Sequence, residues 1–199
     1  MKPEIEVIEK PDWVSWDDIH EVLWKAHAQN RERGINMAFP ALPGDLIQKK
    51  IEEELGKMFV AMNNNIVVGT GAILIKNNSF WWNKDSYVYC CFDSVLPEFR
   101  GHGIYMQIEL KQEEEAIANK IKLLMFDTHE SNKRMLLINK KNGFKAVDIK
   151  VCRDHYNIVM VKWLNGCPYS DWYIRSQFLL RKWYRKLRYK PGGIKRFGI

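Results

Sequence analysis

The sequence predicts an α/β fold, in which a mixed, mostly antiparallel sheet carries helices on both faces and a basic helix follows at the C-terminal end. Two observations support this class. Apolar segments with strand and helix periods follow one another in the order β-α-α-β-β-β-α-β-α-β-β. A hairpin signal, Asn63-Asn64-Asn65, lies among them. We expect one domain over residues 1–165 and a basic aromatic helix and tail over residues 166–199.

The N-terminal elements follow from alternation, helical spacing and breakers. Residues 4–8 alternate as a strand, Pro11 ends it, and Asp12 or Ser15 can cap the next helix. Apolar residues at helical spacing extend that helix to about residue 31. A loop at 34–44, a helix at 45–55, strands at 57–62, 66–75 and 87–95, and a polar excursion at 77–85 complete this part.

The later elements begin with a helix over residues 103–119, in which Ile108, Gln112 and Glu115 are expected to form the solvent-exposed face. A buried strand at 122–128 follows, and then a helix at 132–142 that Gly143 should end in a left-handed conformation. Strands at 145–153 and 156–163 finish the domain.

Composition and charge restrict the function classes. No apolar run reaches the roughly 18 residues of a membrane span, and residues 1–6 do not resemble a signal peptide. The four cysteines form no metal-type pair, so we expect structural roles for them and no metal site. The expected location is cytoplasmic, with a peripheral position at the inner membrane surface as an alternative.

The basic character lies in the tail. Nine bases and one acid give residues 166–199 a net charge of +8, which leaves −1 for the first 165 residues. Trp172, Leu179, Trp183 and Leu187 recur at near-helical spacing between these bases, and Pro191-Gly192-Gly193 should end the helix. Three interpretations stay open: the aromatic face docks on its own domain or a dimer mate, the helix lies on an anionic membrane, or it binds nucleic acid, the least favoured.

The most informative segment is VLPEFRGHGIY at residues 95–105. A strand ends, Pro97 stops the ladder, and a glycine-rich turn opens directly into a helix. Such a turn aims backbone N–H groups and the positive end of the helix dipole at one point, and Arg100 adds a formal charge. Gly101 and Gly103 let an anion approach the backbone. The third glycine of a dinucleotide fingerprint and the lysine of a P-loop are both absent.

This segment resembles the acyl-CoA pyrophosphate loop of GNAT acyltransferases, V-x-P-x-x-R-G-x-G-I-G/A, as far as Ile104, and departs from it at Tyr105. Residues 132–144, NKRMLLINKKNGF, resemble the family's N-x-x-A-x-x-L-Y-x-K-x-G-F segment. With the order of elements, the resemblance covers about residues 5–163. It implies direct acyl transfer from acetyl-CoA, as co-substrate and without a metal, to an amine in a ternary complex.

The resemblance also implies a site for the co-substrate. The strand ending at Val95 would hydrogen-bond the pantetheine arm, and the N–H of Val95 or Leu96 would polarise the thioester carbonyl. Asn132 would contact the CoA arm. The pyrophosphate would lie against Arg100, Gly101, His102, Gly103, Ile104 and Tyr105.

The catalytic groups are less fully specified. The tyrosine that protonates the leaving thiolate in many family members is replaced here by Asn139, which can hydrogen-bond sulfur but cannot supply a proton. Tyr105 and Tyr156 are alternative acids, and the thiolate can also leave unaided. For the base we compare four residues and favour the first, then the second: Asp127, Asp93, His129 and Glu130.

The acceptor pocket is expected between the first two helices, the 34–44 loop and the last hairpin. Five aromatic residues could line it, although each could equally be a core or loop anchor: Trp24, Phe39, Trp81, Trp82 and Tyr156. An amino sugar or nucleotide sugar is the first acceptor class, and a protein or peptide amine the second. The alternatives are a non-catalytic acyl-CoA-binding or interaction module, and a membrane-surface or nucleic-acid-binding protein that uses its tail.

Overall fold

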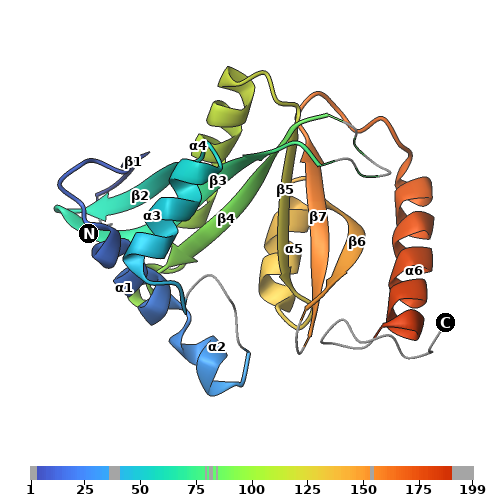
Figure 1. The fold of residues 1–199 in the computed structure, drawn as a ribbon, viewed down its shortest axis with the longest axis horizontal. Helices are drawn as coiled ribbons and strands as arrows, with labels where there is room; N and C mark the ends of the chain where they lie inside the picture. The colour runs from blue at the N-terminus through green and yellow to red at the C-terminus, as the bar shows by residue number, and fades with distance from the viewer. Residues whose placement is uncertain are drawn as a thin grey trace. The chain divides into compact units, whose positions relative to one another are not determined.

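A computed structural model describes residues 4–35, 41–78, 80, 83, 85–152 and 155–189. The chain forms two compact units. The first unit comprises residues 1–77 and 88–121, and the second comprises residues 78–87 and 122–199. Strands and helices follow one another in the predicted order, except that the first predicted helix is divided in two, and the α/β class is confirmed (Figure 1).

The first unit is built on strands in the order β1-β2-β3-β4. Their bounds are Ile5–Glu9, Lys57–Asn63, Ile66–Lys76 and Tyr87–Val95. β1 and β2 pair antiparallel, as do β2 and β3. Asn64 and Asn65 join β2 to β3 with φ angles of 47° and 63°, which is the left-handed geometry of the predicted hairpin turn.

Between β1 and β2 the chain forms three helices of this unit: α1 (Trp16–Ala26), α2 (Ala28–Glu32) and α3 (Gly44–Glu53). Ser15 caps α1 through a capping box with Asp18. The single helix expected to reach residue 31 is wrong in one respect, because the chain breaks at His27 between α1 and α2. At this break the half-buried His27 side chain contacts Ser94 of β4.

Helix α4 (Ile104–Ala118) corrects a second expectation. Ile108 and Gln112, predicted to be exposed, are buried, and so is Glu109. The reason lies in β3: a Cβ added at Gly71 would lie 2.2 Å from the Ile108 side chain, so the glycine lets α4 approach closely. Gln112 is satisfied in this core, because its amide donates to the Ala72 carbonyl oxygen at 3.1 Å.

The second unit has three strands in the order β5-β7-β6, all paired antiparallel. Their bounds are Leu123–His129 for β5, Tyr156–Trp163 for β7 and Lys145–Val151 for β6. Helix α5 (Lys133–Lys141) lies between β5 and β6 in the chain, and Gly143 follows it with a φ of 92°, as predicted.

The predicted C-terminal helix is α6 (Asp171–Arg188), capped by Ser170 and packed beside β6 (Figure 1). Pro191-Gly192-Gly193 lies outside the described residues. None of the described helices combines the length and apolarity needed to cross a membrane. All four cysteines lie in described residues and none forms a disulfide, and Cys90 and Cys91 are buried in β4.

Candidate active site

The turn between β4 and α4 has the geometry of an anion site. A short 3-10 turn (Pro97–Phe99) leads into Gly101 and Gly103, whose φ angles of 88° and 80° are left-handed. A Cβ added at either glycine would meet nothing within 4 Å, so the space over the turn is open. Helix α4 then starts without an acidic residue in its first turn, and its first N–H groups have no acceptor within the helix.

The neighbours of these glycines anchor the turn. The side chain of Ile104 is buried, whereas His102 is exposed. The Arg100 guanidinium donates from Nε to the Val95 carbonyl oxygen at 3.0 Å and from Nη2 to the Ala26 carbonyl oxygen at 2.6 Å. It therefore ties the end of β4 to the end of α1, and its positive charge stays beside the turn.

Strand β4 is distorted just before its end. Phe92 has a φ of 57°, a left-handed conformation that bulky residues adopt only under tertiary constraint and that is typical of a β-bulge. The buried Thr70 hydroxyl donates to the Phe92 carbonyl oxygen at 2.7 Å. Leu96 donates its N–H to the Val68 carbonyl oxygen at 2.9 Å. Because successive N–H groups of an extended chain point in opposite directions, the N–H of Val95 points away from β3.

Adjacent residues of β4 face opposite sides of the sheet. Asp93 is enclosed on the α4 side, where the Gln112 amide donates to its Oδ1 at 2.7 Å. Burial raises the pKa of Asp93 to about 8; the hydrogen bond from Gln112 opposes this rise, and the nearby Glu109 adds to it. Asp93 is therefore a proton-bearing acid at neutral pH, half-buried beside α4.

Ser94 faces the other side and contacts the break between α1 and α2. The Nε2 of His27 lies 2.9 Å from the Ser94 Oγ. The Asn30 side-chain amide lies 3.0 Å from His27 Nδ1. Because an amide nitrogen donates, Nδ1 accepts and Nε2 carries the proton toward Ser94. Burial, with Arg100 and Arg31 nearby, lowers the pKa of His27 to about 4, so the ring is neutral at pH 7.

Sequence reasoning missed this Asn30–His27–Ser94 chain. A signal was present, because His27 lies four residues after Leu23 and therefore on the apolar face of the predicted helix. Trp24, which is expected to line the acceptor pocket, is half-exposed, and the Arg31 guanidinium lies over its ring at 3.6 Å from the ring centre. Phe39, Trp81 and Trp82 lie outside the described residues.

The remaining predicted residues belong to the second unit. Asp127 lies near the end of β5, where Asn157 donates to its Oδ2 and the Lys150 ammonium lies 3.6 Å from its Oδ1. Asn132 caps α5 and donates to the Thr128 hydroxyl at 3.1 Å.

Asn139 lies on the buried side of α5. Its side chain is fully buried, and its amide donates to the Met135 carbonyl oxygen of the same helix at 3.0 Å. The amide is thus already hydrogen-bonded within α5.

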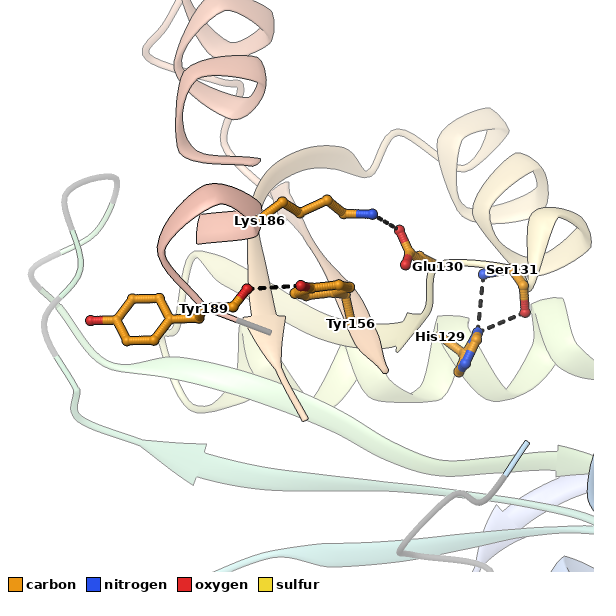
Figure 2. Close-up of polar contacts among 6 residues, drawn as sticks. All are labelled: His129, Glu130, Ser131, Tyr156, Lys186 and Tyr189. Carbon is orange, nitrogen blue, oxygen red and sulfur yellow. Dashed lines mark hydrogen bonds and ion pairs between the residues drawn. The ribbon is translucent and has the colours of Figure 1, made fainter. Parts of the chain in front are cut away.

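The loop after β5 is held by the end of α6, as Figure 2 shows. Lys186 forms an ion pair with Glu130, and the Tyr156 hydroxyl donates to the Tyr189 carbonyl oxygen at 2.8 Å. His129 accepts from the Ser131 N–H at 3.0 Å (Figure 2) and stacks on His155. Each of these alternative acids and bases therefore has a partner in the second unit. Among the described residues, no group of three His, Cys, Asp or Glu side chains could hold a metal ion.

Comparison with known families shows to which family the chain belongs. Residues 16–144 match the acetyltransferase (GNAT) family. The chain belongs to this family.

Solved structures show the same fold as this GNAT protein. An acetyltransferase from Streptococcus agalactiae is 19% identical with a TM-score of 0.63, and the match covers 80% of this chain and 98% of that one. A GNAT acetyltransferase from Elizabethkingia anophelis with acetyl-CoA bound is 16% identical with a TM-score of 0.58, over 80% and 98% of the two chains. The PaiA N-acetyltransferase from Thermoplasma acidophilum, in complex with coenzyme A, is 17% identical with a TM-score of 0.60, over 80% and 99%. No curated protein matches the sequence of this GNAT protein.

Proposed function

We propose that this protein transfers an acetyl group from acetyl-CoA to the primary amine of a small molecule by direct transfer in a ternary complex. An amino sugar or a nucleotide sugar is the acceptor class to test first, and a peptide amine the second. The observation that carries the proposal is the turn at Gly101 and Gly103, whose left-handed glycines lead into the N-terminus of α4, where no side chain caps the helix and no acidic residue lies in the first turn. Membership of the family and the two ligand-bound structures of similar fold support it.

The co-substrate would bind along the end of β4 and the turn. Backbone N–H groups from Gly101 to Tyr105, with the charge of Arg100 beside them, would hold the pyrophosphate. Because the Leu96 N–H is bonded to Val68, Val95 is the better donor to the thioester oxygen, a contact often worth about 3 kcal/mol. Asn132 would contact the pantetheine arm from the start of α5.

In the reaction, the acceptor nitrogen attacks the thioester carbon, the carbon–sulfur bond breaks, and coenzyme A leaves as the thiolate. The proton lost by the amine needs a base. We propose Asp127 for this role, with Asp93 ranked behind it because Asp93 is enclosed against α4. Asn139 would at most donate a hydrogen bond to the leaving sulfur.

The His27–Ser94 pair competes with Asp127 as the group that handles the acceptor. His27 donates to Ser94, which leaves the Ser94 hydroxyl proton for a further acceptor one residue before Val95. We propose that this hydroxyl orients the acceptor amine or the thioester carbonyl. His27 acts behind it as a positioning residue.

The first test is titration of acetyl-CoA into the purified protein and two glycine variants. Gly103→Trp should abolish binding, because a ring would fill the space over the turn. Gly166→Trp is the matched control: its φ is 86°, and a Cβ there also meets nothing within 4 Å. Equal affinities in the two variants would refute the site. An absence of binding by the wild-type protein would refute the proposed co-substrate.

The second test follows thiol release with pooled amines. Asp127→Asn should lower kcat by about 10²-fold or more if Asp127 is the base, with little change in acetyl-CoA affinity. His27→Gln should lower kcat by a smaller factor and Ser94→Ala by a similar one, since the two act as a unit. Tight binding without thiol release for any amine would instead favour the non-catalytic acyl-CoA-binding module.

A further inference from the structure

Helix α6 turns its charged side toward its own unit. Arg185 contacts Asp148 of β6 through Nε at 2.9 Å and Nη2 at 3.0 Å, and Lys186 pairs with Glu130. Ile174 is the one apolar residue of the helix that is buried. Of the three interpretations that the sequence left open, docking of the aromatic face on its own domain is not seen among the described residues, where the inward contacts of α6 include these ion pairs.

The outward side of α6 is apolar. Its large residues recur at helical spacing and cover one continuous face, here called the α6 apolar face. Its exposed fractions are 77% for Trp172, 53% for Leu179, 60% for Leu180, 64% for Trp183, 47% for Tyr184 and 45% for Leu187. A contiguous exposed surface of this kind marks an interaction site.

Positive charges border this face. Arg175 is exposed beside it, and Lys182 and Arg188 are half-buried at its edges. The sequence after Tyr189 adds Lys190, Lys195 and Arg196 and no acidic residue. Tryptophan and leucine on one face with lysine and arginine at its borders are typical of helices that lie in the interface of an anionic bilayer.

We propose that the α6 apolar face binds the surface of an anionic lipid membrane. The rings and leucines would enter the boundary between headgroups and acyl chains, and the bordering cations would meet the lipid phosphates. A second copy of the chain fits less well, because docking two such faces would bring their positive borders together. A nucleic acid fits less well too, because the outward surface is apolar and three bases are turned toward Asp148 and Glu130.

The test is flotation of the full chain with two kinds of vesicle, phosphatidylcholine alone and phosphatidylcholine with about one third phosphatidylglycerol. We expect binding to the anionic vesicles only. Trp183→Ser should weaken it by about tenfold or more, since a large apolar side chain no longer leaves water. Trp13→Ser is the matched control, because Trp13 lies in the first unit and is 61% exposed. It should bind as tightly as the wild type.

A charge series separates the electrostatic contribution. Arg175→Gln should weaken binding to anionic vesicles about fivefold, and Lys49→Gln, which removes an exposed charge far along the sequence, should not. The proposal is overturned if the wild type fails to float with anionic vesicles, or if the Trp13 and Trp183 variants lose binding equally. It is also overturned if sedimentation finds a dimer that Trp183→Ser dissociates while no vesicle binding occurs. None of these readouts depends on acetyl transfer.

Discussion

Helices α4 and α6 both place polar side chains on the side that packs against their own unit, but only α6 exposes a continuous apolar face. Helix α4 buries Glu109 and Gln112 against β3 and β4 of its unit. Helix α6 exposes Trp172 and Trp183, and three of its bases, Arg181, Arg185 and Lys186, pair with acids on the inward side. Both patterns depart from the rule that apolar residues face inward.

The polar side chains that face inward in both helices have partners within the chain, whereas the apolar side chains that α6 exposes do not have such partners among the described residues. The polar residue at the centre of the α4 contact is satisfied, since Gln112 bonds both the Ala72 carbonyl and Asp93. The inward bases of α6 are satisfied by Asp148 and Glu130. The outward rings of α6 have no such explanation among the described residues. A buried polar group that has its hydrogen-bond or ionic partner needs no further explanation, whereas a continuous exposed apolar face indicates a binding partner.

The largest effect is expected at the α4 contact. Native Asp93 keeps its proton up to about pH 8, whereas the unfolded chain releases it near 3.8. The native state therefore binds more protons in this window, and stability falls as the pH rises through it. Asp93→Asn removes the titration. It should raise the free energy of unfolding by roughly 5 kcal/mol at pH 9 relative to its effect at pH 4.

Denaturant titrations from pH 4 to 9 would measure this difference. Asp85→Asn, at an exposed carboxylate, is the control and should follow the wild-type profile. Parallel profiles for wild type and Asp93→Asn would mean that the carboxylate ionises freely, and the contrast between the two helices would weaken.

A smaller effect is expected on the inward side of α6. Asp148→Ala leaves Arg181 and Arg185 facing β6 without their acid. Because both guanidinium side chains are about one third exposed, water screens part of the loss, and we expect about 1–3 kcal/mol. Thermal unfolding measures it against Glu53→Ala, whose pairing with Lys49 is exposed on both sides. Equal losses of stability in the Asp148 and Glu53 variants would show that Asp148 does not stabilise the packing of α6.

The smallest effect belongs to the α6 apolar face. Trp183→Ser should change the free energy of unfolding by no more than about 0.5 kcal/mol, because the ring is mostly in water and little contact is lost. Ile174→Ser, on the buried side of the same helix, should cost several times more. A large loss from Trp183→Ser in dilute protein would place the ring in a structural contact and would undo the comparison.

Much of the fold follows from local patterns in the sequence. Strand β4 spans the residues predicted for it, because an apolar run bounded by a polar excursion and Pro97 leaves little choice. The asparagine turn and the Gly143 stop behave as their backbone preferences require.

The departures come from contacts distant in sequence. The burial of Gln112 depends on Gly71, which lies 41 positions earlier in β3. The break at His27 depends on the contact of its side chain with Ser94. Neither partner is visible in a window of one helix.

The predicted site divides in the same way. The turn at Gly101 and Gly103 could be predicted, because glycines that favour positive φ angles and the start of a helix are recognisable from neighbouring residues alone. The contacts of Arg100 with Ala26 and of Asn139 with its own helix could not, because a side chain's direction depends on packing. The sequence left the direction of α6 open between its own domain, a membrane and a nucleic acid, because its inward contacts include ion pairs with residues of other elements.

The left-handed conformation of Phe92 in β4 determines at which stage, folding or ligand binding, the free-energy cost of bending the strand falls. Holding a phenylalanine at a φ of 57° costs roughly 1–2 kcal/mol, and the Thr70 hydrogen bond helps to maintain it. This free-energy cost falls on folding, so the end of the strand at Val95 already has its final backbone conformation before any ligand binds. In the proposed function, a thioester docked there would meet a strand end that needs no backbone reordering, so little affinity would be lost to that reordering.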